Sequence, residues 1–481
     1  VWLKSNEGTG TAIDNAQGTS ATDGVAVGSP AWVYDAYSVD VYDNSTTTDG
    51  TFTVTQGKVE GLALSSLAFD GINDRILLAN QQDSQLQTSF SFGFWVKLDD
   101  GNPSEEETFI GQNSSSGAHR LKIYHSNQKL YFYYKNGSVG KNAITDATHF
   151  VDNETPWHHI TCTMLYNSSS SATMKVYIDG VEAALDSTHN GVYTGDMGAF
   201  DASHPLMYGA ENNAGSDRLN LDGKMRDIRF YTYALSAEQV ASLYSGTYPQ
   251  TPYHQHKLNE GSGTTANDTG TGTTNNGTIT EATYTNGTLD LDGQLVVAAN
   301  GTLSMPRGDL QMSIISSGLT SFEINCTDVT TQFIHNNGQF VCDSSSAFEI
   351  DANGAAFYKV KANTSGGNLR LIDNTIIEKE LVSGTGASVL IGGNKTFTFG
   401  TATQSADINH VLRASLSGGV PTVTGASTLF PVNINVYDDM ARDYDLKLAN
   451  VNVTTALVHN RDKTITLTGD CEFDAVTVSS G

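Results

Sequence analysis

Short stretches of the chain alternate strictly between apolar and polar residues, a period of two that is typical of half-buried β-strands. The clearest stretch is 90–98, whose apolar positions are Phe90, Phe92, Phe94, Val96 and Leu98, separated by Ser91, Gly93, Trp95 and Lys97. This pattern predicts a core strand of an antiparallel sheet with an aromatic inner face. Further strands are predicted within 51–79 and 157–165, and hairpins at 119–134 and 173–185.

One stretch changes from the strand period to the helical period, which predicts a strand that leads into a helix. Within 221–246, Met225, Ile228 and Phe230 are apolar among charged neighbours, and Val240, Leu243 and Tyr244 then recur at helical spacing. Ser236 and Gln239 supply both halves of a capping box, and Gly246 stops the helix. We expect this helix to close the first domain.

The second half of the chain has a different sequence pattern, with short β-rich segments separated by turns such as Asn337-Gly338 and Asn353-Gly354. The uneven spacing of these segments over 311–481 favours a β-helix or solenoid, and an antiparallel sandwich is the alternative. Between the halves, 256–266 echoes the start of the chain, so 249–310 is expected to begin a second sandwich or to be a connecting β segment. We expect the last domain to continue beyond residue 481.

Composition narrows the class of protein. Asp and Glu number 52 against 26 Lys and Arg, and the resulting net charge of −26 repels nucleic acid and anionic membranes. No apolar run reaches the roughly 18 residues of a membrane span. The four Cys lack metal-ligand spacing: Cys162 is expected in the core, and Cys326 and Cys342 can pair only if their strands stack.

Five short motifs follow one another in a characteristic order: Phe69-Asp70-Gly71, the strand 90–96, Trp157-His158-His159-Ile160, Val176-Tyr177-Ile178-Asp179-Gly180 and the 221–246 segment. Together they resemble the laminin-G-like, concanavalin A-like lectin superfamily over about residues 1–248. The resemblance implies a mainly β fold, in which two antiparallel sheets pack as a jelly-roll β-sandwich. It also implies loops at one rim that carry Ca²⁺ or sugar.

Sequence motifs for catalysis are missing. The nearest match to the paired carboxylates of sandwich glycanases is Glu349-Ile350-Asp351, which lacks the final Glu and lies outside the lectin-like region. The chain has no His-Glu-x-x-His pattern, and no Gly-x-Ser-x-Gly elbow precedes a helix. We therefore expect a protein that is not an enzyme.

Candidate ligand residues follow from strand alternation, chain order and the resemblance. Exposed aromatic rings stack on sugars beside Asn and Asp; these candidates are Trp95, Tyr131, Tyr133, Tyr177, Asn212, Asn213 and Asp217. Calcium takes oxygen ligands from adjacent loops, and these candidates are Asp70, Asn73, Asp74 and Asp222. The alternatives are a covered sheet face in the first case and plain turn residues in the second.

The chain as a whole resembles phage tail fibres, head fibres and bacterial surface adhesins. This resemblance implies an extracellular or virion-surface structural protein whose lectin-like domain binds surface glycans. It also implies assembly as a homo-oligomer or with other virion or surface proteins, where many copies convert weak binding to avidity. Two alternatives stay open: a carbohydrate-binding module of a secreted polysaccharide-degrading enzyme, and an architectural coat or fibre protein with no ligand.

Overall fold

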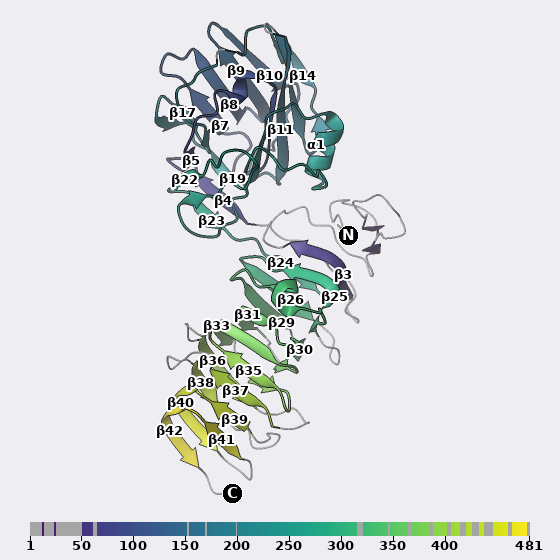
Figure 1. Cartoon of the computed structure of the whole chain (residues 1–481), viewed down its shortest axis with the longest axis vertical. Helices are drawn as coiled ribbons and strands as arrows, with labels where there is room; N and C mark the ends of the chain where they lie inside the picture. Colours follow the sequence, from purple (N-terminus) through teal and green to yellow (C-terminus); the bar gives the residue numbers. More distant parts are fainter. Residues whose placement is uncertain are drawn as a thin grey trace. The chain divides into compact units, whose positions relative to one another are not determined.

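The structure is a computed structural model of the chain, and it divides into two compact units. It describes residues 12–13, 24–25, 51–60, 65–151, 153–168, 171–198, 200–314, 321–344, 347–363, 368–383, 388–401, 406–413, 420–425, 432–436, 446–459 and 464–478. Residues 65–285 form one unit, which we call the sandwich, and residues 1–64 with 286–481 form the other, which we call the parallel unit (Figure 1). The first domain therefore spans 65–285 rather than the predicted 1–248.

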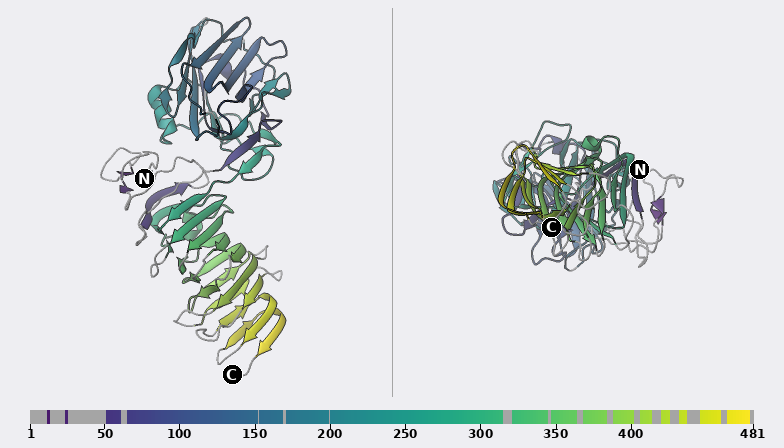
Figure 2. Two further views of the ribbon diagram at one scale, coloured as in Figure 1. Left: turned by 180° about the vertical axis from the view of Figure 1, so that it is seen from behind. Right: turned by 90° about the horizontal axis from the view of Figure 1, so that it is seen from below.

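Two sheets form the sandwich (Figures 1 and 2). One, the helix-covered sheet, has the strand order β13 (Val181–Glu182), β12 (Ser171–Ile178), β11 (His158–Ser168), β6 (Phe90–Leu98), β19 (Asp222–Tyr231), β4 (Ser66–Asp70) and β23 (Thr283–Thr285), with β15 (Val192–Tyr193) and β20 (His254–His256) beside it. The other, the tyrosine sheet, has the order β14 (Leu185–Asn190), β10 (Val139–Thr145), β9 (Lys129–Asn136), β8 (His119–Ser126), β7 (Glu107–Asn113), β16 (Met207–Tyr208), β5 (Arg75–Leu78), β22 (Gly277–Thr280) and β21 (Thr265–Ala266). Next to β7 it also carries β17 (Glu211–Asn213), which pairs with β7 in parallel, and β18 (Ser216–Arg218).

Alternation along the strands decides which side chains fill the space between the two sheets. All five predicted inner-face residues of β6 are buried, and so are Leu121, Ile123 and Phe132 from the tyrosine sheet. The rings of Phe92 and Phe230 lie 4.7 Å apart in this core. Burial of each such side chain stabilises the fold by roughly 1.5–3 kcal/mol. The aromatic core strand predicted from 90–98 is therefore confirmed, and Cys162 is buried as expected.

Helix α1 (Ala237–Tyr244) has the predicted capping box and covers the outer face of the helix-covered sheet. The side chain of Ser236 accepts a hydrogen bond from the Gln239 backbone, and the Gln239 side chain accepts one from the Ser236 backbone. Leu243 packs so closely on β6 that a Cβ at Gly93 would lie 2.9 Å from Leu243 Cδ2. The helix thereby buries a cluster that consists of Tyr177, Tyr231, Leu235, Val240 and Leu243.

The segment after the helix completes the sandwich instead of starting a second one. Strand β20 pairs with β19, β22 pairs with β5, and β23 pairs with β4, so both sheets gain edge strands. Leu258, Ala266 and Ile279 are buried in the same core as β6. The sequence echo at 256–266 therefore does not mark a second domain, because its apolar residues fill the first.

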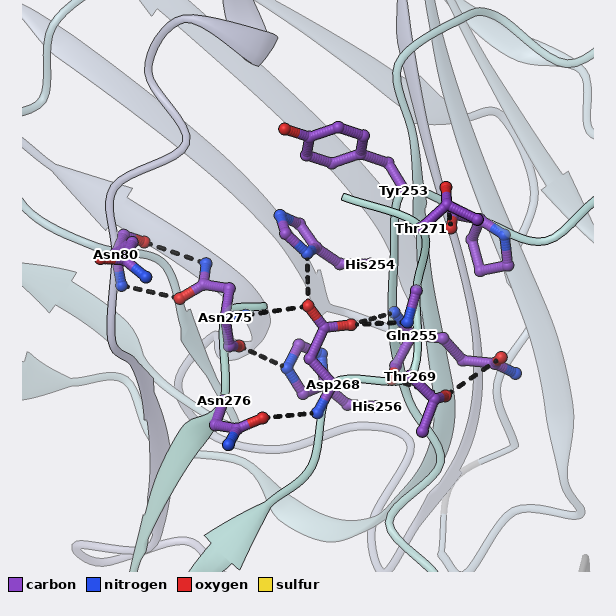
Figure 3. A network of polar contacts seen from close by, with 12 residues as sticks. Asn80, Tyr253, His254, Gln255, His256, Asp268, Thr269, Thr271, Asn275 and Asn276 are labelled. Carbon is purple, nitrogen blue, oxygen red and sulfur yellow. Dashed lines mark hydrogen bonds and ion pairs between the residues drawn. The ribbon is translucent and has the colours of Figure 1, made fainter. Parts of the chain in front are cut away.

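A buried polar network holds this segment in place (Figure 3). Asp268 accepts hydrogen bonds from the backbone N–H groups of Gln255, Gly270 and Asn275, each at 2.9 Å. Its Oδ2 also lies 2.6 Å from Nδ1 of His254, and the side chain of Asn275 bonds the backbone of Asn80 after β5. The network therefore joins strand β20 and the loop that holds Asp268 and Asn275 to the distant residue Asn80.

Strands of the parallel unit from β24 onward pair in parallel, so the alternative of an antiparallel sandwich is wrong here, and the β-helix or solenoid stays a prediction. Strand β3 (Thr51–Glu60) pairs in parallel with β25 (Gln294–Ser304), so 51–60 belongs to this unit and not to the sandwich. The remaining elements are β1 (Ala12–Ile13) and β2 (Gly24–Val25), which pair antiparallel, and β24 (Leu289–Asp292), β26 (Asp309–Ile314), β27 (Phe322–Ile324), α2 (Val329–Gln332), β28 (Phe333–Ile334), β29 (Gln339–Ser344), β30 (Phe348–Asp351), β31 (Ala356–Ala362), β32 (Leu369–Leu371), β33 (Thr375–Ser383), β34 (Ser388–Ile391), β35 (Thr396–Phe399), β36 (Ala406–Arg413), β37 (Thr422–Gly425), β38 (Val432–Val436), β39 (Leu446–Ala449), β40 (Asn452–His459), β41 (Ile465–Thr468) and β42 (Glu472–Val478).

Successive rungs of the parallel unit bury apolar side chains in one continuous core, which includes Phe322, Phe340 and Phe357. Cys326 and Cys342 also lie in this core, and both thiols are free, so the alternative of a disulfide between them is wrong. Among the described residues, no helix is long and apolar enough to cross a bilayer.

Candidate functional site

Chemically active side chains gather on the outer face of the tyrosine sheet. In β8, Leu121 and Ile123 point into the core, so Arg120, Lys122 and Tyr124 face the other way. The register sets Lys122 beside Tyr133 and Tyr124 beside Tyr131 of β9. We call this surface the tyrosine face and define it by Glu106, Thr108, Asn113, Arg120, Lys122, Tyr124, Tyr131, Tyr133, Glu211 and Arg218.

Aromatic rings and cations are interleaved on the tyrosine face. Tyr124 and Tyr131 stack with their centroids 4.7 Å apart and their planes at 21°. Nζ of Lys122 lies 3.7 Å from the Tyr124 centroid, and Cζ of Arg120 lies 5.7 Å from that of Tyr133. The two cation–π contacts orient Tyr124 and Tyr133, and stacking on Tyr124 orients Tyr131, which lowers the entropy lost when a planar partner packs against these half-buried rings.

Lys122 is an unusual part of this face because its side chain is only 2% exposed. Its Nζ lies 2.7 Å from a carboxylate oxygen of Glu106. Burial lowers the pKa of Lys122 to about 8, against the opposing effect of Glu106. Burial also raises the pKa of the Tyr124 hydroxyl, with a further contribution from Glu106. The face therefore holds a desolvated ammonium group, paired with a partly exposed carboxylate, beside a neutral phenol.

A second charged group lies next to Lys122. Glu211 has a fully buried side chain and binds Arg120 through both of its oxygens, at 2.7 Å from Oε2 to Nη2. The Nε of Arg218 donates to the same Oε2 at 2.9 Å. Burial lowers the pKa of the Arg120 guanidinium, but the hydrogen bonds and charge of Glu211 outweigh this and raise it. One carboxylate therefore fixes two guanidinium groups side by side.

Two buried polar atoms on this face have no hydrogen-bond partner among the described residues. They are Oγ1 of Thr108 and Oδ1 of Asn113. Thr108 is the register partner of Tyr124, and Asn113 is that of Arg120, so both belong to the same face of the sheet. A buried donor or acceptor without a partner costs about 1–3 kcal/mol, which a ligand or water molecule can offset.

The predicted sugar-binding residues divide between the two sheets. Tyr131 and Tyr133 lie together on the tyrosine face. Trp95 lies on the opposite sheet, where its ring is 5.7 Å from that of Tyr244 in α1 and 5.4 Å from Cζ of Arg226. Tyr177 is only 1% exposed beneath α1, so the prediction that it stacks on a sugar is wrong. Strand alternation predicted that this sheet face is exposed, but helix α1 covers it.

The three predicted loop residues lie next to β7 but differ in their roles. Asn212 is buried and ties its own loop together, with Nδ2 donating to Pro205 and Oδ1 accepting from Gly215, so it is not free to bind a sugar. Asn213 accepts a hydrogen bond from Asn113 at the edge of the tyrosine face. Asp217 lies 3.4 Å from Arg75.

Among the predicted calcium ligands, Asp70 and Asp222 are register partners of β4 and β19. The carboxylate of Asp74 accepts from the backbone of Asp70 at 2.9 Å, while Asn73 is in contact with Arg75 through its carbonyl oxygen. Burial and neighbouring carboxylates raise the pKa of both Asp74 and Asp222. Within the described ranges, no group of three or more His, Cys, Asp or Glu is arranged to hold a metal ion.

Replacement of Lys122 by Met is expected to remove a pH-dependent part of the stability of the sandwich. Because the pKa of Lys122 is about 8 in the folded protein and 10.5 in a free side chain, the unfolded chain binds more protons between these values. Wild-type protein therefore gains stability as the pH rises through this window, on the order of 2–3 kcal/mol, and Lys122→Met does not. Urea unfolding at several pH values, followed by tryptophan fluorescence, measures the difference.

The control for this prediction is Lys175→Met. Lys175 is an exposed lysine that pairs with Glu182 on the helix-covered sheet. Its replacement is expected to leave the pH profile of stability unchanged. An identical profile for wild type and Lys122→Met would contradict the assignment of the buried charge.

Part of the sandwich matches the model of a known protein family. Residues 70–241 match the family model described as the concanavalin A-like lectin/glucanases superfamily. The match lies within residues 65–285, and it agrees with the resemblance drawn from the five motifs. No curated protein matches the chain.

Solved structures of several proteins are similar to part of the chain. A pentraxin from Limulus polyphemus has 14% identity and a TM-score of 0.27, covering 37% of this chain and 81% of its own. The CBM40 of a Ruminococcus gnavus sialidase has 10% identity and a TM-score of 0.30, covering 38% and 98%. Domains LG4-5 of the mouse laminin alpha1 chain have 12% identity and a TM-score of 0.27, covering 41% and 48%. Values this low support no conclusion about a ligand.

Proposed function

We propose, from the premise that residues 70–241 form a domain of the concanavalin A-like lectin/glucanases superfamily, that this protein binds glycans through the tyrosine face without cleaving them. The observation that carries the proposal is the row of half-buried rings of Tyr124, Tyr131 and Tyr133 among charged and amide side chains. A sugar ring has apolar C–H faces and a rim of hydroxyl groups. The tyrosine rings can pack against the apolar C–H faces, and the amide and charged groups can form hydrogen bonds with the hydroxyl groups.

Tyr131→Ala and Tyr133→Ala are each expected to weaken glycan binding by about 10- to 100-fold, because each removes a preoriented ring from the binding surface. Glycan-array screening with the full chain would identify a ligand, and calorimetry would then give the affinity of each variant. Tyr233→Ala is the matched control, since Tyr233 is an exposed tyrosine outside the tyrosine face. Wild-type affinity in both tyrosine-face variants, with circular dichroism unchanged, would refute the proposal.

The same array, repeated with calcium and with EDTA, tests the predicted calcium site. The proposal places recognition on the tyrosine face, so binding is expected under both conditions. Binding that disappears in EDTA would instead assign recognition to the acidic residues Asp70, Asp74 and Asp222. Absence of binding both with calcium and with EDTA would favour a purely architectural protein.

We further propose that the protein acts outside cells or on a virion surface, as a structural or adhesion protein that assembles in several copies. The pairing of a lectin-like unit with a stack of parallel strands supports this, as does the acidic composition. Electron microscopy of the native assembly would test it. An isolated monomeric chain would contradict it.

A second candidate function is cleavage of a polysaccharide on the parallel unit. Burial and the charge of Asp373 raise the pKa of Asp351, and Asp373 accepts from Nζ of Lys395 at 2.6 Å. Carboxyl groups with unequal pKa values can act as acid and base in glycoside hydrolysis. A reducing-end assay on glycans found by the array separates the candidates: release by wild type and none by Asp351→Asn would favour the enzyme.

A further inference from the structure

We infer that the tyrosine face selects saccharides that carry a negative charge, a carboxylate or a sulfate, over their neutral counterparts. This inference rests on the proposed glycan binding and names the class of sugar. Its basis is the pair of guanidinium groups that Glu211 holds beside the rings.

Glu211 acts as a positioning residue in this arrangement. Both of its oxygens are occupied by Arg120 and Arg218, and its side chain is fully buried. It therefore cannot turn away, and a carboxylate from solvent cannot easily displace it. The two arginines are less covered, with side-chain exposures of 23% for Arg120 and 41% for Arg218. Each guanidinium has five N–H donors, so both have donors left for a second acceptor.

The register places these groups in one row with a tyrosine. Arg218 pairs with Glu211, Glu211 with Gly111, Gly111 with Lys122, and Lys122 with Tyr133. A Cβ at Gly111 would lie 3.0 Å from Cα of Glu211, so this glycine lets β17 approach the sheet. The guanidinium of Arg120 covers part of one face of the Tyr133 ring, with its Cζ 5.7 Å from the centroid, so a sugar that packs against Tyr133 beside it has its substituents near this cation.

The charge of this face is opposite to that of the whole chain. Cationic side chains on the face, Arg120, Lys122 and Arg218, outnumber the carboxylates of Glu106 and Glu211, and Lys135, the register partner of Arg120, adds a further cation beside them. The chain as a whole has a net charge of −26, which repels anions. A local surplus of cations, held in place by a buried carboxylate, is the arrangement that recognises a carboxylate or a sulfate by bidentate hydrogen bonds.

The test uses the full chain and two matched pairs of saccharides. The first pair is oligogalacturonate and its neutral methyl ester; the second is a sulfated galactan oligosaccharide and its desulfated form. We expect at least one acidic member to bind about tenfold more tightly than its neutral partner. Whichever pair shows the difference distinguishes carboxylate from sulfate recognition. Arg218→Gln is expected to remove this preference, because it weakens binding of the acidic member far more than binding of the neutral one.

The control variant is Lys175→Gln, which removes an exposed cation from the other sheet and should keep the preference. Equal affinities for acidic and neutral members would overturn this inference while leaving the proposed glycan binding intact. A preference that survives in Arg218→Gln would also overturn it. Absence of binding to any saccharide in the test or on the array would overturn both.

Discussion

A fragment of residues 65–248 is expected to lose its folded state, whereas a fragment of residues 65–285 is expected to unfold in one cooperative transition. The shorter fragment lacks β20 to β23, so β4, β5 and β19 each lose a hydrogen-bonded neighbour. It also lacks the buried side chains of Leu258 and Ile279, each worth roughly 1.5–3 kcal/mol. Together these losses approach the 5–15 kcal/mol by which a typical domain is stable.

Far-UV circular dichroism and urea unfolding of the two fragments check this prediction. The longer fragment serves as the matched control, because both fragments contain the whole region that matches the superfamily. Equal unfolding midpoints would show that residues 249–285 are dispensable for folding of the sandwich. The C-terminal boundary of the domain would then lie near residue 248, as predicted from the sequence.

Asp268→Ala is expected to destabilise the sandwich by about 3–5 kcal/mol, the second largest effect. The side chain of Asp268 is 1% exposed, and that of His254 beside it is 3% exposed. Removal of the carboxylate leaves His254 and three backbone N–H groups buried without their acceptor. Urea unfolding of the full chain, followed by tryptophan fluorescence, gives the change in the free energy of unfolding.

The matched control is Asp186→Ala, which removes the carboxylate of an exposed His–Asp pair and is expected to change stability by at most about 0.5 kcal/mol. Similar losses in the two variants would contradict the role given to burial of Asp268.

The pH dependence gives a second readout for Asp268. Burial raises the pKa of its carboxyl, but hydrogen bonds from the backbone and from His254 outweigh this and lower it. Its contribution is therefore present above the unfolded pKa of 3.8 and is lost as the pH falls through the lower folded value. Wild type is expected to lose stability in this acid window, and Asp268→Ala is expected to lose less.

The candidate site could be predicted from the sequence only in part. The alternation that placed Leu121 and Ile123 inside also places Arg120, Lys122 and Tyr124 outside, so half of the tyrosine face was readable from one hairpin. Glu211 and Arg218 were not readable, because β17 reaches β7 only through a turn and a parallel pairing. Such a contact between residues nearly a hundred positions apart has no local signal.

The sequence by itself determined the local features of this protein: the inner and outer sides of each strand, the capped helix after Ser236, and the change from sandwich to stacked segments. These depend on periodicity and on caps, which act over a few residues. Only the tertiary structure decided that α1 covers Tyr177, that residues 249–285 complete both sheets, and that 51–60 joins the parallel unit. The physical reason is that the edge of a sheet accepts any strand with a matching apolar face, so long-range pairing selects the partner.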